Sequence, residues 1–315
     1  MTDNNSSDSA DVRQAAERTE NIVIVGSGPA GLTAGIYAAR AGYNPLVIEG
    51  MISGGQLTET AEVENFPGFA ESVSGFDLMM SMRKQAEKAG VRFVMDAITS
   101  VDFSGSPHKL YGMSGTYEAK CTIIATGATS RWTGLPGEDI YKYHGISSCA
   151  VCDGNFHRGK DVAVIGGGDT ALADVIHLAK ICATVTLIHR RDAFRGTKVL
   201  VDRVLAAPNV RTLMNTEVLS FDGDGKKLTA LRLSNGDTLP VSGAFVAIGH
   251  DPQTGFLKGA LELDEAGYIR TDGVETGIDG VFAAGDCANP LYKQAVVAAS
   301  TGAQAAQAAQ HHLER

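Results

Sequence analysis

The sequence predicts an α/β fold in which a strand, a glycine turn, a helix and a second strand occur twice, the second copy being inserted into the domain built around the first. Apolar, β-branched runs lie directly before Gly26 and Gly166, and a helix-forming segment follows each turn. The distance from the turn to the end of the second strand is 23 positions in both copies, from Gly26 to Glu49 and from Gly166 to His189. A shared motif with a shared spacing indicates an internal duplication.

The expected elements follow from these patterns in chain order. Residues 22–25 form a short strand buried on both faces because the run is continuously apolar, and residues 32–41 form a helix behind the turn. A second strand is expected at 45–48. The second copy places its strand, turn, helix and second strand at 162–165, 166–171, 172–181 and 185–188, and further apolar strands are expected at 119–125, 244–248 and 281–284.

The length of 315 residues predicts two domains, since one hydrophobic core seldom supports so long a chain. Residues 1–20 are polar and lack apolar periodicity, so a disordered tail is expected there. The strands at 119–125 and 244–248 are the expected crossings between domains. The predicted division is 21–127 and 249–315 for a discontinuous first domain and 128–248 for the inserted second domain.

Charge and composition exclude several classes of partner. A net charge of -9 argues against nucleic acid, whose phosphates attract clustered Lys and Arg. No apolar run approaches the roughly 20 residues of a membrane helix, and the first twenty residues lack the apolar core of a secretory signal. A cytoplasmic location without membrane attachment is therefore expected.

The first glycine turn is predicted to bind a dinucleotide through its pyrophosphate, as in Rossmann-like domains. Backbone N–H groups and the positive end of a helix dipole face the phosphates at such a turn. Gly26 permits the tight turn, Gly28 lets the phosphate approach, and Gly31 lets the helix lie close to the sheet, with Pro29 and Ala30 between them. Glu49 can accept hydrogen bonds from a ribose diol and would repel a 2′-phosphate, which suits FAD or NAD and excludes NADP.

The second glycine turn is predicted to bind NADPH. No carboxylate stands where Glu49 stands in the first copy, and basic residues follow the second strand instead. Guanidinium forks match phosphate geometry, whereas the alternative for these arginines is a solvated face with salt bridges to Asp192. The predicted NADPH site comprises Gly166, Gly168, Asp169, Thr170, Ala171, His189, Arg190, Arg191 and Arg195.

Cys149 and Cys152 are predicted to form a redox-active pair. If Cys149 opens a helix, the helix dipole stabilises its thiolate, and Cys152 lies on the same face to close a disulfide. Asp153 is a plausible proton donor and acceptor beside the pair. Zinc would need a second ligand pair, and the other three cysteines are scattered singly, which favours core positions for them. Hydride from NADPH does not reduce a disulfide efficiently unaided, so FAD in the first site completes the circuit.

Taken together, these residues resemble the low-molecular-weight thioredoxin reductases from about Asn21 to the C-terminus. This family is built from two Rossmann-like, three-layer ββα domains, with the NADPH domain inserted into a discontinuous FAD domain. The segments that carry the resemblance are 26–31, 54–57, 64–68, 125–127, 149–154, 166–171, 189–195 and 285–286. Residues departing from the family pattern are Val151 for a usual Thr, Asn155 and Phe156 for a more aromatic pair, and Lys293 for a usual Arg.

The resemblance implies functions for further residues. Asp286 binds the flavin ribityl chain, and Gln294 and Ala295 approach the flavin ring. The other residues implied in FAD binding are Gly54, Gly55, Gln56, Leu57, Asn65, Ala125, Thr126, Gly127 and Gly285. Cys152 lies nearer the flavin and Cys149 attacks the disulfide of thioredoxin. The family also implies a homodimer and a rotation between domains, since the cysteine pair and the NADPH site share one domain and need the same flavin.

Three other interpretations remain open from the sequence. A ferredoxin-linked or dithiol-oxidising relative would use the same fold without NADPH, and the arginines count against it. A peroxide-system flavoprotein is expected to carry an additional N-terminal disulfide domain, for which about 20 residues leave no room. A non-catalytic redox-sensing nucleotide-binding module would be expected to lack one thiol, and both are present.

Overall fold

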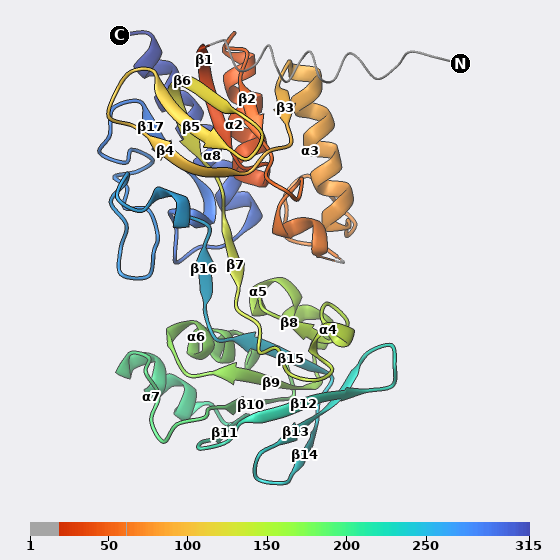
Figure 1. Ribbon diagram of the computed structural model, residues 1–315. Helices are drawn as coiled ribbons and strands as arrows, with labels where there is room; N and C mark the ends of the chain where they lie inside the picture. Colours follow the sequence, from red (N-terminus) through yellow and green to blue (C-terminus); the bar gives the residue numbers. More distant parts are fainter. Residues whose placement is uncertain (1–18, 61) are drawn as a thin grey trace. The chain divides into compact units, whose positions relative to one another are not determined.

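The computed structural model describes residues 19–60 and 62–315 and divides into two compact units (Figure 1). Unit 1 extends to Thr129 and resumes at Asp251–Arg315, and unit 2 is Ser130–His250. The chain passes between them through β7 (Ala128–Ser130) and β16 (His250–Pro252), which pair with each other. Because both crossings continue as strands, each boundary falls two residues beyond its predicted position.

The first strand begins before the predicted end of the tail. Residues 1–18 of that tail lie outside the described residues, but β1 (Thr19–Val25) already includes Thr19 and Glu20. Both residues pair in parallel with β6 (Thr116–Ile124). The Glu20 side chain is buried and forms an ion pair with Arg92, whose Nη1 donates a hydrogen bond of 3.1 Å to Oε1. This contact cannot be recognised from the polar character of Glu20.

The sheet of unit 1 has the order β3-β2-β1-β6-β5-β4. Its centre is parallel, and the long β6 also pairs in parallel with β17 at one end and antiparallel with β5 at the other. The remaining strands are β2 (Leu46–Ile48), β3 (Arg92–Val94), β4 (Ile98–Asp102), β5 (His108–Gly112) and β17 (Val281–Ala283). This arrangement brings the glycine turn after β1 next to the end of β6.

Helices cover one face of the parallel strands of unit 1. In the core on the other face, these strands pack against residues of β5 and of the segment 257–269. The helices are α2 (Pro29–Arg40), α3 (Gly75–Ala89) and α8 (Ala295–Leu313), of which α2 packs against both others. Along β1, Ile22 and Ile24 enter the helix-side core, whereas Val23 and Val25 enter the opposite core. A strand buried on both faces reads as a continuous apolar run, which is how the sequence predicts it. None of the described helices combines the length and apolar character needed to cross a membrane.

Unit 2 repeats the same layering. Its sheet is all parallel, with the order β11-β10-β9-β15-β8. Residues of α5, α6 and α7 form a core with one face of this sheet, and the antiparallel β12-β13-β14 sheet forms a second core with the other face. The strands are β8 (Ile146–Ser147), β9 (Asp161–Gly166), β10 (Thr184–Ile188), β11 (Val210–Leu213), β12 (Val218–Gly223), β13 (Leu228–Leu233), β14 (Thr238–Pro240) and β15 (Gly243–Ala247). The helices are α4 (Glu138–Tyr141), α5 (Ala150–Asp153), α6 (Asp169–Leu178) and α7 (Lys198–Ala206). The duplicated α/β architecture is therefore confirmed.

Candidate active site

The first glycine turn has the geometry that its three glycines predict. A Cβ on Gly26, whose φ is +112°, would lie 2.2 Å from the carbonyl oxygen of Ala125, and a Cβ on Gly31 would lie 1.8 Å from that of Gly26. Gly28 has no atom within 4 Å of an added Cβ and caps α2 without a side-chain hydrogen bond. The helix N-terminus is thus open, and its unpaired N–H groups suit a pyrophosphate.

The second turn repeats this solution in unit 2. A Cβ on Gly166 would lie 2.4 Å from the carbonyl oxygen of Ala247, the counterpart of Ala125, and Gly168 is as open as Gly28. Ala171 replaces the third glycine and is fully buried, while Thr170 is exposed in the first turn of α6. The same backbone constraint therefore produces two phosphate-type turns in one chain.

Residues 54–57 lie beside the first turn. Gly54 N donates a hydrogen bond of 3.0 Å to Ser27 Oγ, and a Cβ on Gly55 would lie 3.3 Å from Gly28 Cα. Gln56 and Leu57 follow in the 3₁₀ helix η1 (Gln56–Glu59). The structure thus gathers the 54–57 loop, the turn and the 125–127 strand end at one place, although they are far apart in sequence.

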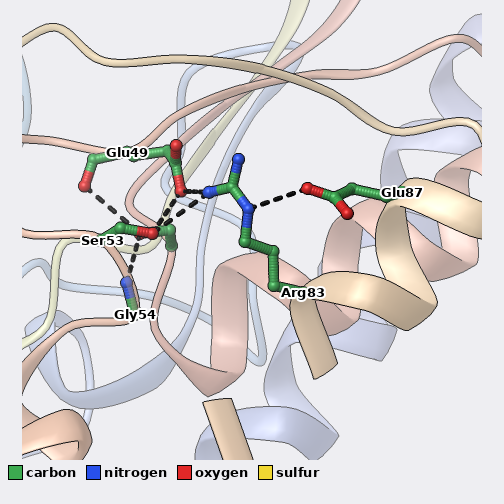
Figure 2. A network of polar contacts seen from close by, with 6 residues as sticks. Glu49, Ser53, Gly54, Arg83 and Glu87 are labelled. Carbon is green, nitrogen blue, oxygen red and sulfur yellow. Dashed lines mark hydrogen bonds and ion pairs between the residues drawn. The ribbon is translucent and has the colours of Figure 1, made fainter. Parts of the chain in front are cut away.

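Glu49 directly follows β2, where a ribose-binding carboxylate is expected, and Arg83 and Ser53 hold one of its two carboxylate oxygens (Figure 2). Its side chain is 5% exposed and forms an ion pair with Arg83 through Oε1. The same oxygen accepts a hydrogen bond of 2.6 Å from Ser53 Oγ. No hydrogen bond to Oε2 is formed by the described residues, so this oxygen remains available to a ligand.

Asp286 provides a second carboxylate in unit 1 and is a half-buried residue. It lies in the 3₁₀ helix η4 (Gly285–Cys287), where burial raises its pKa to about 6 despite the opposing effect of Lys293. Its carboxylate accepts no hydrogen bond from the described residues. A buried acceptor without donors is costly unless a ligand supplies them, and polyol hydroxyls do so. Nearby in the fold, Asn65 Nδ2 donates a hydrogen bond of 3.1 Å to Gln294 Oε1, directly before Ala295 opens α8.

The basic segment of unit 2 is fastened to the second glycine turn. Arg195 N and Gly196 N donate hydrogen bonds of 2.8 and 3.2 Å to Gly167 O, and Thr197 N donates one of 2.6 Å to Asp169 Oδ1. The side chains of Arg190, Arg191 and Arg195 are exposed and form no ion pair with Asp192 or any other described residue. The salt-bridged alternative is therefore absent from the described part of the chain.

Two residues of the predicted NADPH site have a supporting role in this geometry. The His189 ring is buried, its Nε2 donates a hydrogen bond of 3.0 Å to Ala193 O, and a Cβ on Gly167 would come within 2.3 Å of the ring. The ring therefore packs directly against the backbone of the turn at Gly167. The Asp169 carboxylate accepts a hydrogen bond from Thr197 N, and this contact anchors the basic segment to the turn.

Cys149 and Cys152 form a disulfide with a Cα–Cα distance of 5.3 Å. Cys149 is the N-cap of α5, and its Sγ accepts a hydrogen bond of 3.2 Å from Cys152 N. Both residues are partly exposed, and Val151 between them is 53% exposed. The expectation that Cys149 opens a helix is confirmed, although α5 is a single turn.

Asp153 is the last residue of this helical turn, and its surroundings favour the neutral, protonated form of its carboxyl group. Burial raises its pKa, opposed by a hydrogen bond with Ser147. Ser147 Oγ in turn accepts a hydrogen bond of 3.0 Å from Cys149 N. The same hydroxyl donates a hydrogen bond of 3.4 Å to Cys149 O, so Ser147 holds the backbone of the predicted nucleophile on both sides.

Sequence reasoning missed Asp174, a half-buried acid in α6 whose Oδ2 atom is buried. Its Oδ2 has no hydrogen-bond partner among the described residues, and burial raises its pKa to about 7. It lies one turn before His177 and Leu178, whose side chains pack against Gly154 at the end of α5. Nothing in the alternation of residues marks it, since an Asp in an Ala-rich helix ordinarily faces solvent.

We expect Asp174→Asn to stabilise the protein at pH 8. Because the folded pKa lies above the unfolded value of 3.8, the folded state binds more protons between these values and stability falls as pH rises through this window. The variant removes this loss, a gain of about 2–4 kcal/mol at pH 8 that shrinks towards pH 4. Calorimetric unfolding midpoints from pH 4 to 8 measure it, with the exposed Asp192→Asn as control. Equal pH profiles for the variant and the unchanged protein would contradict the assignment.

The remaining cysteines occupy cores, as predicted. Cys121, Cys182 and Cys287 are free and buried. Burial raises the pKa of all three thiols, that of Cys121 to about 12. They are therefore poor nucleophiles beside the Cys149–Cys152 pair.

Two open dinucleotide-type turns and a partly exposed disulfide in one chain define a nucleotide-dependent disulfide oxidoreductase. Residues 20–302 match the family described as pyridine nucleotide-disulphide oxidoreductase. A thioredoxin reductase of Streptomyces coelicolor is 45% identical over 295 residues, covering 91% of each chain. The solved thioredoxin reductase from Giardia duodenalis has a TM-score of 0.91 and 41% identity, covering 95% of this chain and 100% of that one. The chain belongs to the thioredoxin reductases of the pyridine nucleotide-disulphide oxidoreductase family.

One similar protein has a different name. A Pseudomonas fluorescens protein called glucosaminate ammonia-lyase is 44% identical over 310 residues, covering 94% of this chain and 97% of its own. Sequence identity therefore does not decide between a thioredoxin reductase and an ammonia-lyase for this chain. The chemistry of the site has to do so.

Proposed function

We propose that this chain is an NADPH-dependent thioredoxin-disulfide reductase that passes electrons through FAD to the Cys149–Cys152 pair and on to thioredoxin. The observation that supports this proposal most strongly is the disulfide at the start of α5. It lies in the unit that also contains the second glycine turn and the basic segment beside it. A lyase reaction requires no such pair, whereas a disulfide reductase depends on it. The names of the thioredoxin reductase relatives support the proposed acceptor.

Unit 1 has the residues to hold FAD. The open N-terminus of α2 suits the pyrophosphate, Glu49 Oε2 suits the ribose diol, and the undonated Asp286 carboxylate suits the ribityl hydroxyls. When bound, FAD supplies the two-electron relay between nicotinamide and sulfur. The loop 54–57, Asn65 and the 125–127 strand end complete the proposed lining, together with Gly285, Gln294 and Ala295.

Unit 2 has the residues to hold NADPH. The open N-terminus of α6 suits the pyrophosphate, and the exposed guanidinium groups of Arg190, Arg191 and Arg195 are available to a 2′-phosphate. Backbone hydrogen bonds to Gly167 O hold the basic segment beside the turn. The site can therefore distinguish NADPH from NADH by charge.

We expect the two simplest substitutions of Asp169 to have opposite effects. Asp169→Asn keeps an acceptor for Thr197 N and removes a negative charge near the pyrophosphate, so NADPH should bind a few-fold more tightly. Asp169→Ala releases the basic segment, and NADPH should bind about tenfold more weakly. Equilibrium titration of both variants with NADPH measures this. Equal weakening by both would indicate that Asp169 itself contacts the nucleotide.

Three residues carry the proposed dithiol chemistry: Cys149, which caps α5, and Cys152 and Asp153 within it. In the reduced pair, the Cys149 thiolate attacks the disulfide of thioredoxin and forms a mixed disulfide, and one thioredoxin thiolate leaves. The Cys152 thiolate then attacks Cys149 Sγ, which restores the Cys149–Cys152 disulfide and releases the second thiolate. Asp153, whose burial favours its protonated form, donates one proton to one departing thioredoxin thiolate, and solvent supplies the proton for the other.

Two further features belong to this proposal. The cysteine pair and the proposed NADPH site share unit 2, so access of each to one flavin calls for rotation about β7 and β16, the strands that join the units. Homodimerisation is carried over from the family resemblance. Sedimentation and cross-linking of the FAD-loaded protein with and without NADPH test both.

A single set of assays tests the proposed function. Under anaerobic conditions, NADPH should bleach the flavin absorbance of the FAD-loaded protein, and addition of oxidised thioredoxin should restore it. The same protein should reduce thioredoxin with NADPH much faster than with NADH. Absence of bleaching would favour the ferredoxin-linked alternative, and bleaching without thioredoxin reduction would favour another acceptor.

A further inference from the structure

Arg83 occupies a position that the sequence analysis did not assign. It lies in α3, 34 residues beyond Glu49, and its side chain is 22% exposed. Its guanidinium stacks 4.2 Å from the centre of the Phe93 ring, and its Nε donates a hydrogen bond of 3.0 Å to Glu87 Oε1. These contacts leave the guanidinium little freedom to move.

The contacts between Arg83 and Glu49 are one-sided (Figure 2). Arg83 Nη1 reaches Glu49 Oε1, and it also donates a hydrogen bond of 3.1 Å to Ser53 Oγ, which itself donates to the same oxygen. Glu49 Oε2 and Arg83 Nη2 form no hydrogen bond with a described residue. The pair therefore offers one free acceptor and one free donor.

The pKa of Arg83 is raised, so its guanidinium keeps its positive charge. Burial lowers the pKa of Arg83, but its hydrogen bonds and ion pairs with Glu49 and Glu87 outweigh that effect and raise it overall. Glu87 is half-exposed, so solvent screens its share of the guanidinium charge more than that of the buried Glu49. Glu49 is thus the main group that masks the positive charge of Arg83 at this edge of the sheet.

We propose that Arg83 is a specificity-determining residue of the first nucleotide site, which orients Glu49 towards an unphosphorylated ribose and is masked by it against phosphate. This inference rests on the proposed binding of FAD in unit 1. Arg83 acts on the ribose through Glu49, because it immobilises Oε1 and leaves Oε2 free. Loss of the Glu49 charge would convert the same place from one that repels a 2′-phosphate into one that attracts it.

The first part of the test uses the full-length apoprotein and three variants. Arg83→Met removes the guanidinium and keeps an apolar stem, and it should raise the dissociation constant for FAD about tenfold or more. Arg83→Lys keeps the charge without the fork and should recover part of that loss. Lys84→Met removes one positive charge at the next, exposed position of α3 and should bind FAD like the unchanged protein. Quenching of flavin fluorescence measures each affinity.

Glu49→Gln, made alone and with Arg83→Met, separates a role through Glu49 from a structural one. Glu49→Gln should also weaken FAD binding about tenfold, and the double variant should be no weaker than this single variant, because Arg83 acts through the carboxylate. Adenosine 2′,5′-bisphosphate is the probe for the unmasked charge. It should bind to unit 1 of Glu49→Gln but not to unit 1 of the double variant, with Arg190→Ala/Arg191→Ala in the background of both to suppress binding to unit 2.

The outcomes distinguish this inference from the proposed function. If the unchanged apoprotein fails to bind FAD, the proposed function falls before any variant is measured. If it binds FAD and Arg83→Met binds equally well, only the inference is overturned. Additive losses in the double variant, or equal binding of the bisphosphate with and without Arg83, overturn it as well.

Discussion

Cys149→Ser should abolish thioredoxin reduction while the flavin is still reduced by NADPH. The substitution removes the only sulfur that the proposed mechanism uses as a nucleophile towards an external disulfide, and a serine hydroxyl is not ionised at neutral pH. The steady-state rate should fall by about three orders of magnitude or more. Stopped-flow bleaching of the flavin by NADPH should keep its rate, because that step involves unit 2 through its nucleotide site.

Cys182→Ser is the matched control for this experiment. It makes the same chemical change in the same unit, at a buried thiol outside the α5 turn. Turnover should be retained within a few-fold. Full activity of Cys149→Ser, or equal losses in both variants, would remove Cys149 from the mechanism and favour a redox-sensing role or a different acceptor.

Replacement of Arg190 and Arg191 by Ala should remove the preference for NADPH over NADH. Both guanidinium groups are exposed and unpaired among the described residues, so their loss disturbs no internal contact. Charge-assisted hydrogen bonds to phosphate contribute about 1.5–3 kcal/mol each, so kcat/KM for NADPH should fall about a hundredfold or more. The value for NADH should change little, because NADH carries no 2′-phosphate.

Arg211→Ala is the control for charge alone, since Arg211 is exposed on β11 of the same unit. It should retain the preference for NADPH. At high salt, the advantage of the unchanged protein for NADPH should shrink, because exposed charges are screened. Equal losses with NADPH and NADH in the double variant would contradict recognition of the 2′-phosphate by these arginines.

The sequence predicts the parts of the molecule in which backbone geometry leaves few alternatives. Gly26 and Gly166 each lie beneath the carbonyl oxygen of a neighbouring strand, where no side chain fits. The motif therefore predicts both the turn and the fold around it. Cys149 and Cys152 are similarly constrained, because a spacing of three on a helical turn brings two sulfurs within bonding distance.

Contacts between distant segments could not be predicted in the same way. The stretch between Glu49 and residue 119 carries no predicted element, yet it contains α3 and the β4-β5 hairpin. Arg83 is one basic residue among several on an amphipathic helix, and only the tertiary packing of α3, in which Arg83 stacks on Phe93 of β3, brings it to Glu49. Asp174 and His189 were equally hard to interpret, because burial of a polar side chain depends on neighbours from other elements. The predicted cytoplasmic location stays a prediction.

The burial of Cys121, Cys182 and Cys287 has a practical consequence for repeated turnover. Thiols withheld from ionisation and from solvent cannot intercept an incoming disulfide, so shuffled cross-links within the chain have no route to form. An alkylating reagent applied to the native reduced protein should consequently label two sulfurs and spare three. The three protected thiols thus serve as an internal reference for the fraction of the Cys149–Cys152 pair that is reduced.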